Sequence, residues 1–145
     1  MLSQGVGYAI SALSFLAAAG GKSLLVKDIA AATGIPPAYL AKIVHALGKR
    51  GVVATQRGVG GGVTLARPAS DISLFDLALA LQDPVVEPMC LLGGAVCSDE
   101  RACPAHEFWK AQRAEIHSYL QTTRVSDVAA FEADRMWKAS KPGTV

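Results

Sequence analysis

Apolar residues recur every three or four positions through the first fifty residues, which is the spacing of a helix with one buried face. This spacing predicts three helices, over residues 3–19, 27–33 and 37–48. Gly34 suits the turn between the second and third helices, and Pro37 suits the first turn of the third. The pattern is typical of a helix-turn-helix. The buried stripe of the third helix is expected to comprise Tyr39, Leu40, Ile43, Val44 and Leu47.

Two short runs of β-prone residues follow, at 52–55 and 63–66, and the glycine-rich segment 57–62 lies between them. Two strands around such a tip predict a β-hairpin directly after the helix-turn-helix, which is a wing. Glycine there allows positive φ angles and a close approach of the backbone to another surface. A phosphate-binding loop is the weaker interpretation, because no Lys-Ser or Lys-Thr pair follows and the next element is a strand. The expected fold class is mainly α with a small β-hairpin, a winged helix-turn-helix.

The second half of the chain predicts three further helices. The first covers residues 74–82, with Ser73 and Asp76 near its N-cap. A long amphipathic helix is expected over 105–122, and its simplest role is dimerisation; the alternative is that it folds back on its own domain. A last helix is expected over 126–138, followed by a loose tail. The long helix is expected to carry one apolar stripe of Trp109, Ile116, Tyr119 and Leu120. The last helix is expected to pack through Val128, Phe131 and Trp137.

These elements divide the chain into a winged helix-turn-helix domain at 1–82, a cysteine-rich loop at 83–104, and a dimerisation helix with a C-terminal helix at 105–145. Of the 145 residues, 51% are apolar, which is enough for a core. No apolar stretch reaches 18 residues, and the N-terminus lacks a basic region and a cleavage site. Neither a membrane span nor a secretion signal is therefore expected. Together with the odd number of cysteines, this indicates a reducing, cytoplasmic location.

Charge is distributed unevenly between the two halves. Residues 1–70 carry seven basic residues and one acid, Asp28, whereas residues 71–145 carry seven basic residues and eleven acids. The first half has a net charge of +6 and the second a net charge of −4. This asymmetry indicates that the winged domain binds a polyanion, which we expect to be double-stranded DNA. The residues expected to face DNA lie on the third helix and the wing: Pro36, Ala38, Tyr39, Lys42, His45, Lys49, Arg57, Gly58 and Gly60.

All three cysteines of the chain, with one histidine, lie within seventeen residues in the pattern C-x6-C-x5-C-x2-H. Thiolates and imidazole are ligands for zinc and for iron–sulfur centres, and the Gly- and Pro-rich segment around them would let them converge. The candidate metal ligands are Cys90, Cys97, Cys103 and His106. From the ligand types alone, zinc and iron–sulfur remain open, and so does a metal-free switch in which the thiols oxidise to disulfides.

Catalytic motifs are missing from the sequence. It contains no Gly-x-Ser-x-Gly and no His-Glu-x-x-His, and its acids are scattered over predicted helix surfaces. An enzyme is therefore not expected.

Two stretches, PPAYLAKIVHALGKRGVVATQRGVGGGVTLARPASDISLFDL and CLLGGAVCSDERACPAHEFWK, resemble the Rrf2 family of bacterial regulators, typified by IscR, NsrR and RirA. The resemblance runs from Gln4 to about Val128. It implies a homodimeric winged-helix transcription factor, a repressor or an activator. Such a protein would bind a near-palindromic operator and sense iron–sulfur status, nitric oxide or redox state through an iron–sulfur cluster.

The resemblance also assigns roles to individual residues. Cys90, Cys97 and Cys103 match the three cluster cysteines, and His106 matches the histidine that completes a 2Fe–2S cluster in IscR-like members. Arg57 matches the wing arginine used against DNA. Two features depart from the family pattern. The cysteine spacing is wider than in the IscR loop, which leaves a 4Fe–4S cluster open, and Tyr8 stands where some NsrR-like members have an acid.

Overall fold

The computed structural model of the chain describes the backbone of residues 1–140 and the side chains of residues 1–134. The predicted tail at 141–145 and the predicted packing of Trp137 lie outside these ranges. In chain order the helices and strands are α1 (Gln4–Ala18), α2 (Val26–Thr33), α3 (Pro37–Lys49), β1 (Val53–Gln56), β2 (Gly62–Leu65), α4 (Leu74–Ala80), α5 (His106–Thr122) and α6 (Val125–Ser140). Short 3-10 turns lie at η1 (Ala69–Asp71), η2 (Pro84–Val86) and η3 (Asp99–Arg101).

The helix-turn-helix consists of α2 and α3, as predicted. Gly34 ends α2 in the left-handed conformation, with φ of 74°, and Pro37 lies in the first turn of α3. Leu40, Ile43, Val44 and Leu47 of α3 are buried. Tyr39 was predicted to belong to this stripe, and that was wrong: its side chain is 41% exposed.

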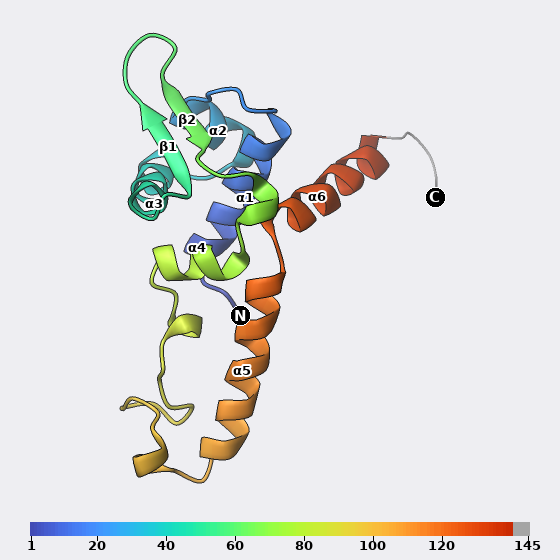
Figure 1. Cartoon of the computed structure of the whole chain (residues 1–145). Coiled ribbons are helices and arrows are strands. Elements are labelled where there is room, and N and C mark those ends of the chain that lie inside the picture. The colour runs from blue at the N-terminus through green and yellow to red at the C-terminus, as the bar shows by residue number, and fades with distance from the viewer. Residues whose placement is uncertain (141–145) are drawn as a thin grey trace.

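Strands β1 and β2 form the predicted wing. They pair antiparallel, with Val53 opposite Leu65, each strand being displaced by one residue from its expected range. Leu24, before α2, extends the wing: it exchanges two backbone hydrogen bonds with Val63, of 3.0 and 2.7 Å. The hairpin projects from the helical domain, with its tip away from the body of the protein (Figure 1).

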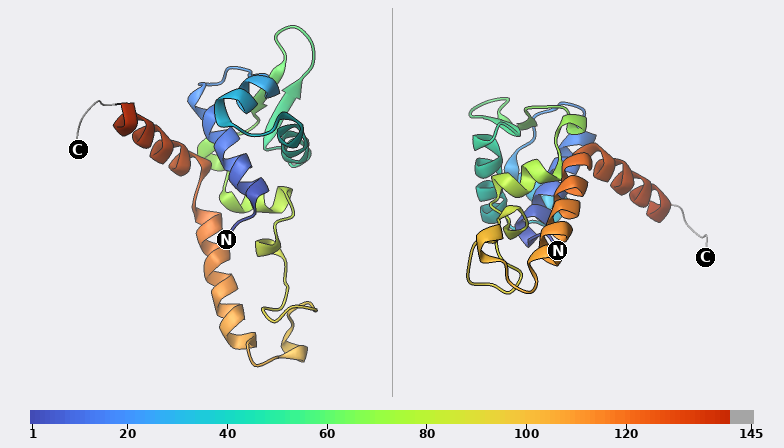
Figure 2. Two further views of the ribbon diagram at one scale, coloured as in Figure 1. Left: turned by 180° about the vertical axis from the view of Figure 1, so that it is seen from behind. Right: turned by 60° about the horizontal axis from the view of Figure 1, so that its bottom comes forward.

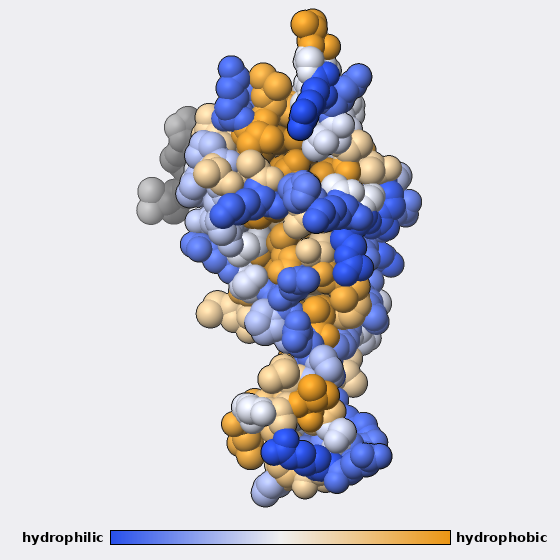
Figure 3. Space-filling view, turned by 90° about the vertical axis from the view of Figure 1, so that its left-hand side faces the viewer, coloured by the Kyte–Doolittle hydropathy of each residue, from blue (hydrophilic) through white to orange (hydrophobic). Residues whose placement is uncertain are grey.

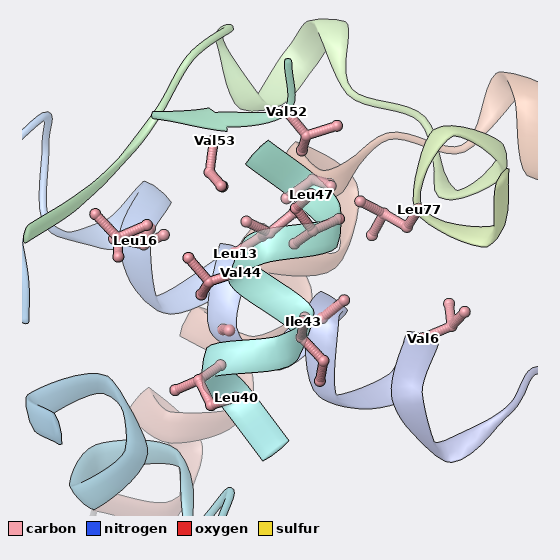
Figure 4. Packing of buried hydrophobic residues seen from close by; sticks show 14 of the residues in the cluster. Val6, Leu13, Leu16, Leu40, Ile43, Val44, Leu47, Val52, Val53 and Leu77 are labelled. Atoms are coloured by element: carbon pink, nitrogen blue, oxygen red, sulfur yellow. The ribbon is translucent and has the colours of Figure 1, made fainter. Parts of the chain in front are cut away.

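The hydrophobic core lies between α1, α2, α3 and α4, beneath the wing. Its largest fully buried side chains include Leu13, Ile29, Leu40 and Leu47, and Figure 4 shows the side chains of α3 pointing toward those of α1. Burial of each such side chain stabilises the fold by roughly 1.5–3 kcal/mol. The core also receives Leu120 and Val125 from the C-terminal half, and both are almost completely buried. The junction of α5 and α6 is therefore anchored in the winged domain.

Helix α4 connects the winged domain to the cysteine loop. Ser73 Oγ accepts a hydrogen bond from the Asp76 amide and Asp76 Oδ2 accepts one from the Ser73 amide, which together form a capping box. Gln82 then takes a left-handed conformation, with φ of 52°, and turns the chain away from the helix.

Beyond this turn, residues 83–105 run alongside α5 and form a second lobe, joined to the winged domain by a narrow waist (Figures 2 and 3). Helix α5 packs against α4 and η2, and α6 packs against α1. Phe131 of α6 was predicted to pack, and that was wrong: it is 60% exposed. Within residues 1–140, none of the helices combines the length and the apolar composition that spanning a membrane requires.

Candidate metal centre and nucleic-acid interface

The cysteine loop is more regular than the sequence suggests. The Cys90 amide donates to Ala95 O at 2.9 Å and the Cys97 amide donates to Pro88 O at 2.6 Å, which makes a small hairpin of residues 88–97. Gly93 and Gly94 form its turn, with φ of 80° and 82°. Cys90 and Cys97 lie on the two arms of this hairpin and line the same cavity, and the turn η3 then leads to Cys103.

The four candidate ligands, Cys90, Cys97, Cys103 and His106, line one cavity of about 270 Å³. They form two close pairs. Cys90 Sγ lies 3.6 Å from Cys103 Sγ, and Cys97 Sγ lies 3.3 Å from His106 Nδ1. The structure therefore brings together all four residues that the sequence pointed to. All three cysteines carry free thiols.

The two pair distances can be compared with metal geometry. A tetrahedral metal with bonds of roughly 2.3 Å to sulfur and 2.0 Å to nitrogen separates two sulfurs by about 3.8 Å, and a sulfur and a nitrogen by about 3.5 Å. Each observed pair distance is within a few tenths of an ångström of the corresponding ligand–ligand separation, so each pair could bind one metal atom. Among the described residues, no three histidine, cysteine or acidic side chains converge as a single-ion site.

The charge of the Cys90 thiol is influenced by its neighbours. Hydrogen bonds from the Leu92 backbone and the Cys103 thiol lower the pKa of Cys90, and the nearby Arg101 adds to the effect. A lowered pKa favours the thiolate, which is both the metal-binding and the oxidisable form of cysteine.

His106 is held in position from both sides of its ring. Its side chain is 5% exposed, and Nε2 lies 2.8 Å from Asp99 Oδ1 on η3, opposite the Nδ1 atom that faces Cys97. The same Asp99 oxygen accepts a hydrogen bond from Lys110 Nζ at 2.9 Å. The hydrogen bonds from His106 and Lys110 lower the pKa of Asp99, and the bond to Asp99 raises the pKa of Lys110. The sequence analysis did not identify Asp99, because its role depends on the fold of the loop.

Two side chains of α5 attach the loop to the helix. Trp109 Nε1 donates to Met89 O at 2.8 Å, and His117 Nε2 donates to Val85 O at 2.7 Å. The His117 ring also packs edge-on against Phe75 of α4, with a centroid distance of 5.3 Å. The lobe that contains the cysteines is thus connected through α5 and α4 to the winged domain.

The candidate DNA-contacting residues lie on an exposed face formed by α3 and the wing. Each of the nine, from Pro36 to Gly60, is exposed, and hydrophilic side chains cover much of this face (Figure 3). Tyr39 has a second contact, because its ring packs edge-on against Tyr8 of α1, with a centroid distance of 5.5 Å.

A helix-turn-helix, a wing that follows it directly and a basic exposed face define a winged-helix transcriptional regulator. The chain belongs to the Rrf2 family: residues 2–130 match the family model described as an iron-dependent transcriptional regulator. An HTH-type transcriptional regulator of Aquifex aeolicus is 32% identical over 143 residues, which are 97% of this chain and 99% of that protein. The regulator IscR of Vibrio atlanticus is 32% identical over 83% of this chain and 70% of its own length.

Solved structures share the fold. T. potens IscR has a TM-score of 0.70 at 23% identity and covers 99% of this chain and 93% of its own. CymR, the global cysteine regulator of B. subtilis, has a TM-score of 0.72 at 22% identity, over 90% of this chain and 97% of that one. These matches confirm the predicted winged helix-turn-helix and the predicted family. They also confirm that the chain is a transcriptional regulator rather than an enzyme.

Proposed function

We propose that this regulator binds its DNA as a homodimer and that an iron–sulfur cluster held by Cys90, Cys97, Cys103 and His106 controls that binding. The observation that carries the proposal is the single cavity that all four side chains line, with its two pairs at 3.6 and 3.3 Å. Two ligand pairs suit a 2Fe–2S cluster, in which each iron takes two protein ligands. A single zinc ion would need all four atoms to close around one point.

The cluster, when bound, supplies a centre that changes with iron supply, oxidation or nitric oxide. The residues around the cluster would couple its binding to the position of the winged domain. Hairpin 88–97 and turn η3 hold the ligands, while Trp109 and His117 join this lobe to α5 and α4. Loss of the ligand contacts would release the lobe and change how the winged domains are spaced.

The dimer is proposed to form through α5. Phe108 and Tyr119 are both exposed, and they lie eleven residues apart, about three helical turns, on one face of this helix. A second copy packed on that face would bury both rings. Two-fold symmetry then places two winged domains on half-sites about one DNA turn apart, or roughly 34–36 Å, so a small change of spacing weakens binding.

DNA contact is proposed for the exposed residues of α3 and the wing. Lys42, His45 and Lys49 of α3 would reach the major groove or its phosphates, and Arg57 would contact DNA from the tip loop of the wing, which it begins directly after β1. The glycines at 58 and 60 let the wing backbone approach the duplex closely.

A second candidate function is a metal-free thiol switch. The 3.6 Å separation of Cys90 Sγ and Cys103 Sγ favours it, because a small movement would allow a disulfide when an oxidant removes two electrons and two protons from the thiols. The structure of Staphylococcus aureus CymR in an oxidized form shows the same fold, with a TM-score of 0.67 and 24% identity.

The deciding experiment is purification without oxygen, followed by iron and acid-labile sulfide analysis and by absorption and Mössbauer spectra. We expect about two irons and two sulfides per chain, with visible absorption. DNA binding measured with and without nitric oxide should then change with the cluster. Colourless protein, free of iron and sulfide, whose DNA binding responds only to oxidants would support the thiol switch instead.

A further inference from the structure

We infer that Asp99 is a positioning residue for the cluster: it fixes the His106 ring so that Nδ1, and not Nε2, is the atom presented to the metal. This inference rests on the proposed function. It concerns a residue outside the cysteine–histidine pattern, on the 3-10 turn between Cys97 and Cys103.

The hydrogen bonding determines which ring nitrogen carries the proton. An ionised carboxylate can only accept, so Asp99 Oδ1, 2.8 Å from Nε2, requires the proton of a neutral imidazole to be on Nε2. The lone pair is then on Nδ1, the atom 3.3 Å from Cys97 Sγ inside the ligand cavity. Because the ring is buried, it has little freedom to turn and exchange the two nitrogens.

The charged groups near His106 are expected to change the reduction potential of the cluster. A carboxylate that accepts from a metal-bound histidine makes that ligand more basic, which favours the more oxidised metal. Lys110 opposes this effect, because its ammonium group shares the same Asp99 oxygen at 2.9 Å. Asp99 is 75% exposed, so this pair connects a buried ligand to the surface of the lobe. The structure therefore contains a carboxylate and an ammonium group with opposite expected effects on the reduction potential of the cluster.

The test compares three variants of the anaerobically purified full-length protein. Asp99→Ala removes the acceptor, and we expect its cluster to have a higher reduction potential and to be lost to a chelator more readily, on the roughly 10- to 100-fold scale of outer-shell changes. Lys110→Met should shift the potential in the opposite direction. Glu100→Ala is the matched control, because it removes an exposed acid from the neighbouring position of the same turn. A shift caused by net charge alone would be equal in Asp99→Ala and Glu100→Ala.

The identity of the ligand atom is tested separately. Wild-type protein labelled with ¹⁵N at histidine Nδ1 should show strong hyperfine coupling to the reduced cluster by electron–nuclear double resonance. Strong coupling from Nε2, or equal potentials for Asp99→Ala and Glu100→Ala, would overturn the inference while leaving the cluster in place. Wild-type protein without iron and sulfide would instead overturn the proposed function, and this result precedes any comparison of variants.

Discussion

The carboxylate of Asp83 accepts a hydrogen bond of 2.7 Å from the backbone amide of Ser3, a residue eighty positions earlier in the chain. Asp83 begins the cysteine loop, and Ser3 is the N-cap of α1. The same carboxylate accepts from the Val85 amide at 2.9 Å, and the residue is only 2% exposed. Because α1 packs against α3, this buried carboxylate joins the start of the cysteine loop to the domain that contains the helix-turn-helix.

Replacing Asp83 with alanine should destabilise the fold, because the backbone amides of Ser3 and Val85 would lose their buried acceptor. We expect a loss of about 1–3 kcal/mol in the free energy of unfolding, measured by urea denaturation. Glu87→Ala is the control, since Glu87 is an exposed acid a few residues along the same loop. Equal stability of the two variants would show that the Ser3 contact does not stabilise the protein.

The Asp83 contact also predicts how stability depends on pH. Burial raises the pKa of this carboxyl group, but the hydrogen bonds from Val85 and Ser3 and the positive N-terminus outweigh burial, so the pKa lies below its ordinary 3.8. A lowered pKa in the folded state stabilises the protein above the ordinary value, and this stabilisation is lost as the pH falls through the folded-state value. The difference in unfolding free energy between wild type and Asp83→Asn should therefore be constant near neutral pH and shrink in acid. A difference that grows as the pH falls would contradict this assignment.

The wing depends on a glycine that no other residue replaces easily. Gly62 has φ of 138°, and an added Cβ would lie 2.6 Å from Leu24 O and 2.7 Å from Ser23 Oγ. Gly62→Ala should therefore separate β2 from Leu24 and distort the wing, lowering the melting temperature and weakening DNA binding in a fluorescence anisotropy titration. Gly7→Ala is the matched control, because Gly7 lies within α1 with open space around its Cβ position, where alanine should be neutral or stabilising by up to about 1 kcal/mol.

Arg57 is expected to contact a DNA phosphate. Arg57→Ala should lower affinity similarly for all sequences and reduce the slope of log affinity against log salt concentration by about one. Arg67→Ala is the control, since this guanidinium is bound within its own domain, 3.5 Å from Asp76 and 3.2 Å from Asp71 O. A salt dependence unchanged in Arg57→Ala would remove Arg57 from the interface.

The sequence predicted the fold well, because local signals agreed with one another. Helix periodicity, Gly34, Pro37 and the glycine-rich hairpin each have a physical meaning that does not depend on distant residues. Tyr39 was misassigned because its position on α3 lies at the edge of the buried face, where Tyr8 of another helix decides its contacts. Contacts between distant segments gave no sequence signal. The sequence contains twelve acidic residues, and nothing in it marks Asp83. Its role becomes visible only in the folded chain, where the Ser3 amide donates to its carboxylate.

The three cysteines can distinguish the two candidate functions. If a 2Fe–2S cluster is bound, alanine at any of positions 90, 97 and 103 removes a ligand, so Cys90→Ala, Cys97→Ala and Cys103→Ala should each lose most of the visible absorption and alter DNA affinity. If a disulfide is the switch, Cys97→Ala should behave as wild type, because the close sulfur pair is Cys90 and Cys103, 3.6 Å apart. Absorption spectra of anaerobic protein and DNA titrations with and without oxidant measure both outcomes. Ser98→Ala, at an exposed position beside Cys97, is the control that keeps every ligand. A cluster retained at full occupancy in Cys97→Ala would show that Cys97 and His106 do not form a metal-binding pair.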